Sequence, residues 1–341
     1  MKKIALAILN WNGRTLLETY LPHVIRHSEE ADIWLVDNHS DDDSVAWAKA
    51  NFPEINILEL DANHGYAEGY NQALEVIKND WIGLVNSDIR TSENWLLPIL
   101  EDIQKNPRSG AIQPKILDDR DPERFEYAGA SGGFIDQWGY PFCRGRIFDT
   151  LEVDRAQYDE PMEIFWATGA CLFVKRSCFM ESGRLDADFF AHMEEIDLCW
   201  RIQRKGYSIR VVPASVVFHL GGGTLSAQNS KKTYLNFRNN LLLLYKNLDR
   251  NRILTLFGRM ILDGVSALKF LMDGKANFSI AVLKAHFHFY RMLPTLRQKR
   301  REVKELGTLK LPTGWYKGSI VWAFFIRRKK TFSSLPKRSF V

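Results

Sequence analysis

The chain has 341 residues, 45% of them hydrophobic, and a net charge of +5, which allows one large domain or two ordinary ones with a sizeable core. No stretch approaches the roughly 18 uncharged apolar residues of a membrane-spanning helix, and the apolar run Ile4 to Leu9 is too short for a signal peptide. The four cysteines have no metal-binding spacing and are expected to be buried thiols in a reducing compartment, which excludes a disulfide framework.

The first part of the chain alternates between short apolar runs and segments in which apolar residues have helical spacing. Strands are expected at Ile4 to Leu9, Asp32 to Asp37, Ile55 to Leu60 and Trp81 to Val85. Helices are expected between them at Thr15 to Arg26, Asp43 to Asn51 and Tyr66 to Lys78. Repeated strand and helix units of this length require parallel strands with right-handed crossovers, so the expected fold class is α/β with a nucleotide-binding type of sheet.

Polar residues follow each of these four strands. They are Asn10-Trp-Asn-Gly13, Asp37-Asn-His-Ser40, Asn63-His-Gly-Tyr66 and Asn86-Ser-Asp88. Parallel strands end at the same edge of their sheet, and ligands of open α/β sheets bind there, so we expect the four clusters to converge on a polar ligand. Asp88 offers oxygen ligands for a divalent cation, although a turn that caps the next helix is an alternative.

The next part of the chain is less regular. Asp118 to Glu163 loses its periodicity and contains five glycines, which predicts a long irregular insertion of the kind that is often functional. Strands are expected at Phe165 to Lys175 and Ile209 to Phe218, with a helix at Glu194 to Lys205 between them and a further helix at Tyr234 to Leu248.

The C-terminal region is amphipathic and basic. Residues 227–341 contain 24 Lys and Arg against 5 Asp and Glu, whereas residues 1–226 contain 22 against 36, which indicates an anionic partner for the C-terminal region. Arg252 to Met272 has an apolar side opposite Arg259, Asp263 and Ser266. Such helices favour an anionic membrane surface, and a helical cap with a solvated basic tail is the alternative. No recognition motif supports a nucleic-acid partner.

Two further apolar stretches, Asn277 to Arg291 and Ile320 to Ile326, share this character, and Arg327-Arg-Lys-Lys330 follows the second.

Seven elements of this sequence, in this order, resemble the family-2 glycosyltransferases of the GT-A fold, particularly their rhamnosyltransferase-like bacterial branch. They are Ile8-Leu-Asn-Trp-Asn-Gly13, Val36-Asp-Asn-His-Ser40, Asn63-His-Gly-Tyr-Ala-Glu-Gly-Tyr-Asn71, Leu84-Val-Asn-Ser-Asp88, Ala167-Thr-Gly-Ala-Cys171, Glu194-Glu-Ile-Asp-Leu-Cys-Trp-Arg201 and His219. The resemblance covers about residues 4 to 245. It implies a nucleotide-diphospho-sugar transferase fold with a mixed, mainly parallel central sheet and a C-terminal helical region.

The implied division is a catalytic domain at residues 1–225, with a nucleotide-binding half at 1–117 and an acceptor-binding half at 118–225. Residues 226–341 form the basic, amphipathic C-terminal region.

In that family the first two clusters, with Asn10 and Asn12, hold the nucleotide. The resemblance implies that Trp11 flanks the base and that Asp37 accepts a hydrogen bond from it, and a buried helix cap is the alternative for Asp37. Residues that open the third helix are then expected to meet the diphosphate, because glycine lets the backbone approach and the helix N-terminus favours negative charge. These residues are Asn63, Gly65, Gly69 and Asn71. No dinucleotide glycine pattern follows the first strand, which disfavours hydride transfer.

Asn86-Ser87-Asp88 occupies the place of the family's D-x-D motif, with an amide instead of its first acid. The resemblance implies that Asp88 is the principal ligand of Mg²⁺ or Mn²⁺, with Asn86 and Ser87 nearer the sugar or ribose. His219 matches a position at which metal-using relatives supply an imidazole, which suits Mn²⁺ better than Mg²⁺. A hydrogen-bonded core histidine is the alternative for His219.

The family's catalytic base is the second acid of an acidic pair, which falls on Glu195 where Asp is usual. Asp197 is the second candidate, although at this spacing it can simply pair with Arg201. Glu194 is expected to orient the acceptor or the base. The implied reaction is an inverting single displacement without a covalent intermediate.

The expected function is transfer of a sugar from dTDP-rhamnose or a UDP- or GDP-sugar to a glycan or lipid-linked acceptor in cell-surface polysaccharide synthesis. The expected location is cytoplasmic, peripheral on the inner face of the cytoplasmic membrane. A sugar-nucleotide-binding protein without transfer activity is one alternative, and a nucleic-acid-binding protein acting through its basic tail is another.

Overall fold

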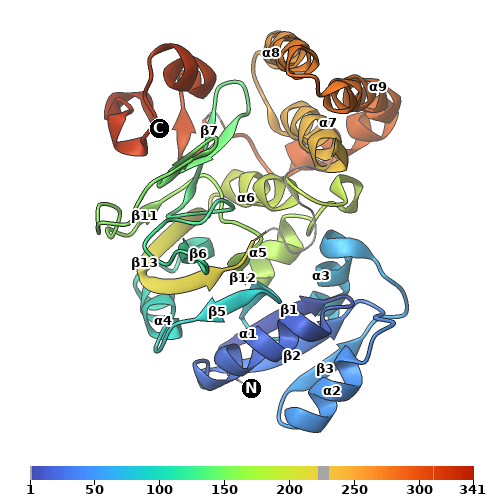
Figure 1. Cartoon of the computed structure of the whole chain (residues 1–341), viewed down its shortest axis with the longest axis vertical. Coiled ribbons are helices and arrows are strands. Elements are labelled where there is room, and N and C mark those ends of the chain that lie inside the picture. The colour runs from blue at the N-terminus through green and yellow to red at the C-terminus, as the bar shows by residue number, and fades with distance from the viewer. Residues whose placement is uncertain (1, 222–229, 310) are drawn as a thin grey trace.

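A computed structural model describes residues 2–221, 230–309 and 311–341. The chain forms a central sheet between two layers of helices, with further helices stacked at the end away from the N-terminus (Figure 1). One face of the sheet packs on α1 (Arg14–Arg26), α2 (Ser44–Asn51) and α4 (Leu96–Lys105). The other face packs on α3 (Gly65–Val76), α5 (Arg176–Glu181) and α6 (Glu194–Arg204).

The N-terminal half of the sheet is parallel, in the order β4, β1, β2, β3. These strands are β1 (Ile4–Asn10), β2 (Ala31–Asp37), β3 (Asn56–Glu59) and β4 (Trp81–Asn86). These strands and the helices between them confirm the predicted α/β pattern. The apolar runs of β1 and β4 are buried on both faces of the sheet, as is usual for parallel strands covered by helices.

The other half of the sheet is mixed. Strand β12 (Cys171–Lys175) runs antiparallel to both β4 and β6 (Ser109–Asp118), and β13 (Ser208–His219) runs parallel to β6. Strand β13 has two further antiparallel partners at different points along its length. Strand β11 (Met162–Glu163) pairs near the start of β13, and β5 (Ile89–Thr91) pairs at its end. The mixed sheet is therefore confirmed, although the strand predicted from Phe165 begins only at Cys171.

The expectation of an irregular insertion at residues 118–163 is wrong in part, because this segment contains most of a second, small sheet. Its strands are β7 (Gly133–Asp136), β8 (Pro141–Cys143), β9 (Arg146–Ile147), β10 (Thr150–Leu151) and β14 (Trp315–Tyr316). Strands of two to four residues are too short to show a periodicity of two in the sequence.

The C-terminal segment belongs to this small sheet. Strand β14 pairs in parallel with β7, and the rings of Phe332 and Phe340 lie 4.7 and 5.4 Å from that of Phe134. Phe142, which is 1% exposed, contacts the same rings. The segment from residue 311 onwards is therefore packed against the insertion.

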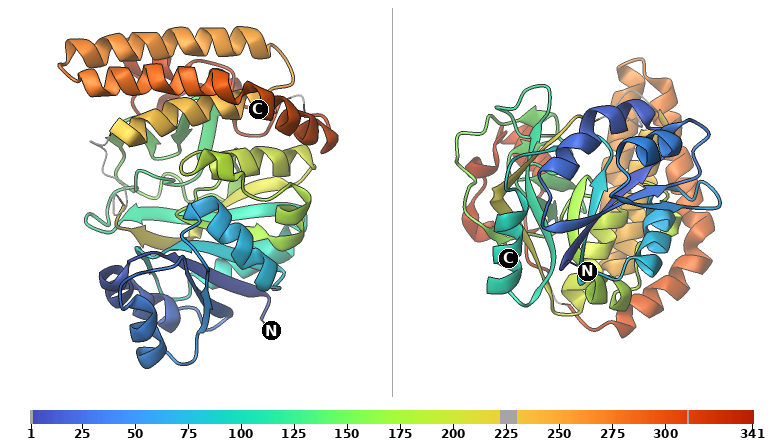
Figure 2. Two further views of the ribbon diagram at one scale, coloured as in Figure 1. Left: turned by 90° about the vertical axis from the view of Figure 1, so that its right-hand side faces the viewer. Right: turned by 90° about the horizontal axis from the view of Figure 1, so that it is seen from below.

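Helices α7 (Ser230–Asn247), α8 (Arg252–Met272) and α9 (Ala276–Glu305) are stacked in layers, and α8 and α9 are outermost (Figure 2). The polar side of α8 faces the protein, because Arg259 and Asp263 are buried and pair at 2.6 Å. Most of the large apolar side chains of α8 are exposed, although Leu256 is buried. Of the described helices, none is long and apolar enough to cross a membrane.

The predicted domain boundary at residues 225 and 226, and two of the three glycines after His219 and Leu220, fall in the segment 222–229, outside the described residues. The boundary stays a prediction.

Removing the ring of Phe142 tests whether the C-terminal segment is packed as described. Phe142→Ala should lower the free energy of unfolding by about 3–5 kcal/mol, because it leaves a cavity among the rings that join β8 to the C-terminal segment. Urea denaturation measures this. The matched control is Phe325→Ala, since Phe325 is 52% exposed and should cost less than half as much. Equal costs would contradict the packing.

Candidate active site

The ends of β1 and β2 are joined by side-chain hydrogen bonds. Asn10 and Asp37 are opposite each other in the parallel register, both are buried, and Asn10 Nδ2 donates to Asp37 Oδ1 at 2.9 Å. The hydroxyl and backbone N–H of Ser40 donate to Asp37 at 2.6 and 2.9 Å. Asp37 is therefore oriented by three hydrogen bonds from within the chain.

The other side-chain atom of Asn10, Oδ1, is a buried acceptor that has no hydrogen-bond partner among the described residues. A Cβ at Gly13 would come within 2.4 Å of that oxygen, so the glycine keeps the space beside it free of a side chain. Trp11 is 51% exposed, and Asn12 Oδ1 accepts from the backbone N–H of Asp41 at 2.7 Å. A buried acceptor next to an exposed aromatic ring suits a planar ligand that carries hydrogen-bond donors.

The third cluster is tied to the second through Asn38. Its Nδ2 donates to Asn63 Oδ1 at 3.1 Å and to the carbonyl of Gly65 at 3.0 Å. Asn63 Oδ1 also accepts from the N–H of Gly65 at the start of α3, where Gly65 has a φ of 71° that favours glycine. The hydroxyl of Tyr66 donates to the carbonyl of Gly169 at 2.7 Å. The N-terminus of α3 is thereby fixed at the edge where β1 and β2 end.

Two residues predicted to meet the diphosphate have other surroundings. A Cβ at Gly69 would lie 3.0 Å from Leu9 Cδ1, so this glycine allows α3 to pack closely on β1. Asn71 exchanges two hydrogen bonds with the backbone of Leu185, at 2.9 and 3.1 Å. These contacts give Gly69 and Asn71 a packing and a bracing role within the chain, and their expected contact with the diphosphate stays a prediction.

The fourth cluster meets the first. A Cβ at Gly13 would lie 3.9 Å from Ser87 Oγ, and Asn86 and Ser87 are half-buried at the end of β4. The four strand ends predicted to converge are thus brought together.

Asp88 and His219 meet because β5 pairs with the end of β13, with His219 opposite Ile89. His219 Nε2 lies 3.1 Å from Asp88 Oδ1, and His219 Nδ1 lies 3.2 Å from Glu126 Oε1. All three side chains are buried. Burial lowers the pKa of His219, but hydrogen bonds and charge from the two carboxylates outweigh it and raise the pKa to about 10.

Asp88 and His219 would fit one divalent cation once His219 gives up its Nε2 proton, because the 3.1 Å contact is a hydrogen bond from the protonated imidazole to the carboxylate. A carboxylate oxygen and a neutral imidazole nitrogen are both ligands for such a cation. Glu126 on the other nitrogen resembles the carboxylate that orients a metal-bound imidazole. Within the described ranges no group of three His, Cys, Asp or Glu side chains could hold a metal ion unaided. A bound diphosphate would have to complete the ligand set.

The acidic pair opens α6. Burial, and then repulsion from Glu195, raise the pKa of Glu194 well above its usual value, and burial raises the pKa of Glu195 to about 7. Among the described residues, neither Oε2 has a hydrogen-bond partner, although both atoms are buried. Glu195 therefore changes between acid and carboxylate near neutral pH.

Asp197 lies in the same helical turn but has the opposite electrostatics. It is fully buried, and its carboxylate pairs with Arg201 at 2.8 Å and with Lys246 at 2.9 Å and accepts from Asn247 at 2.8 Å. Burial alone raises the pKa of Asp197, but the two cations lower it below its usual value. The surroundings of Asp197 therefore favour its ionised form and supply partners for both carboxylate oxygens.

Glu126 is a site residue that sequence reasoning missed, since no strand-end or helix pattern surrounds it. Burial raises the pKa of the Cys143 thiol, and the carboxylates of Glu126 and Glu195 both add to this. The Asp88–His219–Glu126 cluster and the acidic pair are therefore within electrostatic range of the same thiol.

Replacing Glu195 should stabilise the fold. The folded-state pKa of about 7 exceeds the ordinary 4.5, so the wild type loses stability as the pH rises between these values. Glu195→Gln should therefore raise the free energy of unfolding by about 2–3 kcal/mol near pH 8 and by almost nothing near pH 4. Urea denaturation at both pH values measures the difference.

Asp197→Asn is the matched control within the same turn. It should lower the free energy of unfolding by about 3–5 kcal/mol at neutral pH, because it leaves buried cations without their carboxylate. The same sign of change in both variants would contradict the contrast between the two carboxyls.

Three comparisons relate this geometry to known proteins. Residues 6–170 match the family described as Glycosyl transferase family 2. The chain is 29% identical over 224 residues, 60% of this chain and 71% of the relative, to an N-acetylglucosaminyl-diphospho-decaprenol L-rhamnosyltransferase of Mycobacterium tuberculosis.

Two solved structures share the fold at low sequence identity. A mannosyltransferase from Pyrobaculum calidifontis in complex with GDP-Man and Mn²⁺ matches with a TM-score of 0.50 and 15% identity, over 91% of this chain and 77% of that one. GalNAc-T7 with UDP, GalNAc and Mn²⁺ matches with a TM-score of 0.57 and 16% identity, over 73% of this chain and 49% of that one. The chain therefore spans about half of the GalNAc-T7 chain. Residues 6–170 thus carry the likeness to glycosyl transferase family 2, and the two structures show that the chain has the GT-A fold of these glycosyltransferases.

Proposed function

We propose that this glycosyltransferase moves one sugar, with inversion, from a nucleotide-diphosphate sugar to a hydroxyl of a glycan or lipid-linked acceptor in cell-surface polysaccharide synthesis. The donor is dTDP-rhamnose or a UDP- or GDP-sugar. The observation that carries the proposal is the acidic pair: Glu195 is buried at the start of α6 with a pKa of about 7, and its carboxylate and that of Glu126 both raise the pKa of the Cys143 thiol.

The nucleotide end of the donor occupies the converged strand ends. The exposed ring of Trp11 flanks the base, and Asn10 Oδ1 is the acceptor free to receive a hydrogen bond from it. Asp37 and Asn12 hold the segments after β1 and β2 in place through hydrogen bonds with Asn10, Ser40 and Asp41. Asn63 and Gly65 present the N-terminus of α3, whose positive end favours the diphosphate. Asn86 and Ser87 lie next to the ribose or the transferred sugar.

The reaction is a single displacement. Asp88 and His219 would hold Mg²⁺ or Mn²⁺, and the cation would offset negative charge on the diphosphate. The acceptor oxygen attacks the anomeric carbon, the bond from that carbon to the diphosphate oxygen breaks, and Glu195 takes the hydroxyl proton. Asp197 is disfavoured as the base because its lone pairs are committed to Arg201, Lys246 and Asn247.

Variants of Glu195 and Asp88 test this assignment. Glu195→Gln should lower transfer at least a hundredfold while it retains donor binding, because it removes the base and leaves the strand ends intact. Asp88→Ala should lower transfer and its response to added Mn²⁺. Transfer of labelled sugar to lipid-linked acceptors from a nucleotide-sugar panel, with calorimetry for donor binding, measures both.

The pH dependence gives an independent check. In the wild type kcat should rise through pH 7, where Glu195 loses its proton, and level off above it. Full transfer activity in Glu195→Gln and Asp88→Ala would contradict the site. Donor binding without turnover against every acceptor would contradict the transfer reaction.

The C-terminal region, residues 226–341, supports peripheral attachment to an anionic membrane surface. Helix α8 exposes eight apolar side chains, Ile253, Leu254, Phe257, Ile261, Val265, Leu268, Leu271 and Met272. Helix α9 adds Ile280, Leu283, Phe287 and Tyr290. Monomeric proteins rarely expose a continuous apolar surface of this kind without a partner.

A lipid surface fits this apolar face better than water does, because α8 has its charged pair inside and its apolar stripe outside. Exposed Lys269, Lys275, Lys284 and Arg291 flank the stripe, and the charge of the region favours anionic headgroups over a second, equally basic copy. The C-terminal segment, shown in dark red, lies at the same end of the molecule as α8 and α9 (Figure 1). This segment contains the exposed Trp322 and the basic run after Ile326.

Liposome binding tests this attachment. The wild type should sediment with vesicles that contain anionic lipid, less so at high salt, and Phe257→Glu with Leu268→Glu should lower binding at least tenfold. The matched control is Leu97→Glu on α4, whose side chain is 43% exposed, and it should bind like the wild type. Unchanged binding in the double variant, or loss of a dimer instead of liposome binding, would contradict attachment through α8.

A further inference from the structure

The acidic pair is preceded by a strained stretch of backbone. Phe190, His192 and Met193 have φ values of 65°, 68° and 76°, in the left-handed region that side chains other than glycine rarely adopt. Met193 directly precedes Glu194, so this strained stretch sets where α6 starts. Such conformations cost on the order of 1–3 kcal/mol each and persist only where the surroundings hold them.

Two neighbouring side chains of α7 donate hydrogen bonds to the backbone carbonyl groups of this stretch. The amide of Asn239 donates to the carbonyls of Phe189, Ala191 and His192 at 2.9, 2.8 and 2.7 Å, and Asn239 is fully buried. Arg238 Nη2 donates to the carbonyls of Asp188 and Phe189, both at 2.9 Å. These bonds satisfy buried backbone acceptors that a strained, non-helical stretch cannot satisfy by itself.

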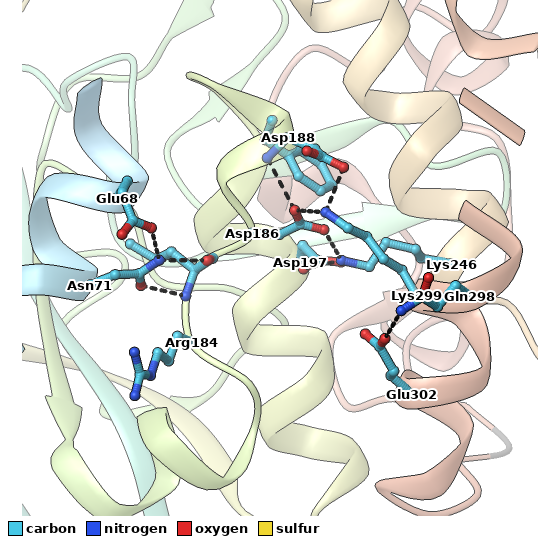
Figure 3. Close-up of polar contacts among 12 residues, drawn as sticks. Glu68, Asn71, Arg184, Asp186, Asp188, Asp197, Lys246, Gln298, Lys299 and Glu302 are labelled. Carbon is cyan, nitrogen blue, oxygen red and sulfur yellow. Dashed lines mark hydrogen bonds and ion pairs between the residues drawn. The ribbon is translucent and has the colours of Figure 1, made fainter. Parts of the chain in front are cut away.

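Ion pairs from α7 and α9 hold the same stretch on both of its sides (Figure 3). Upstream, Lys299 of α9 pairs with Asp186 and Asp188, and Lys246 of α7 pairs with Asp186. Downstream, Lys246 also pairs with Asp197 inside α6, at 2.9 Å. In the sequence, the acidic pair therefore lies between Asp186 and Asp197, and both of these residues pair with lysines of the C-terminal helices.

We propose that Asn239, supported by Arg238, is a positioning residue for the base of the reaction: by holding the carbonyls of Phe189, Ala191 and His192, it fixes the start of α6 and so the direction of the Glu195 carboxyl. This rests on the proposed role of Glu195. Asn239 bonds only backbone carbonyls there, so it acts through Glu195 and touches neither donor nor base.

The neighbouring residue supplies a matched control. Asn240 is equally buried on the same helix, but its amide donates to the carbonyl of Gly139 and its oxygen accepts from Arg259. It therefore braces the β7–β8 turn and α8, and bonds nothing in the stretch before α6. Loss of either amide costs buried hydrogen bonds, but only loss of Asn239 releases the start of α6.

Steady-state kinetics of Asn239→Ala and Asn240→Ala in the full chain separate positioning from stability. Asn239→Ala should lower kcat about tenfold to a hundredfold, since small displacements of a reacting group have effects of that size, with the KM for donor within about twofold. Asn240→Ala should keep kcat within about twofold of the wild type despite a comparable loss in thermal stability. The same kcat in both variants would overturn the proposal.

A milder pair keeps the test decisive if Asn239→Ala does not fold. Arg238 is half-buried, so Arg238→Met should fold, lower kcat and leave the donor KM unchanged, and Arg238→Lys should recover part of kcat. Retained transfer in Glu195→Gln would instead overturn the proposed base. If Glu195→Gln is inactive while Asn239→Ala and Arg238→Met both turn over like Asn240→Ala, the positioning role alone is overturned.

Discussion

The buried carboxylate of Asp197 is the charge on which the arrangement of the active site depends. A carboxylate without solvent costs several kcal/mol unless it is paired, and Asp197 is paired from two helices, by Arg201 of its own and by Lys246 and Asn247 of α7. Helix α7 cannot move away from α6 without leaving these charges uncompensated. Because Lys246 also reaches Asp186, the same pairing governs the path of the chain into the acidic pair.

One helical turn thereby gives two acids opposite properties. Burial raises the pKa of Glu195 to about 7, and no ion pair of Glu195 is found in the described part of the chain, whereas Asp197 has two cations that lower its pKa. The difference comes from neighbours rather than from residue type, and it separates a group that can exchange a proton from one that holds the fold. Helix α8 follows the same logic, since the partners of Arg259 and Asp263 are inside the protein and its polar side is therefore buried.

Features that depend on residues close together in the sequence could be predicted, and features that depend on contacts between distant residues could not. The strand ends around Asn10, Asp37 and Asp88 were predictable because apolar runs and the polar residues after them are local patterns. Glu126 and Asn239 were not, because their partners lie about a hundred and about fifty residues away along the chain. The periodicity of α8 was visible in the sequence, but which of its faces turns inward depends on what α7 and α9 offer it.

Gly69 illustrates the same dependence on distant residues. A glycine near a helix N-terminus suits the close approach of a ligand or of another side chain equally well, and the position of Leu9 beside Gly69 appears only in the folded chain. The short strands of the small sheet were missed because two to four residues cannot display a period.

The parallel pairing of β14 with β7 has a consequence for how the chain folds as it is made. Trp315 pairs with Ile135, 180 residues earlier, and at the usual 5–20 residues per second synthesis of that interval takes on the order of 10–40 s. For that time one edge of β7 stays unpaired while α8 and α9 emerge with their apolar faces. A nascent chain in this state exposes an unpaired strand edge and the apolar side chains of α8 and α9 at the same time. Synthesis close to a membrane would shorten the time for which these apolar side chains are exposed to water.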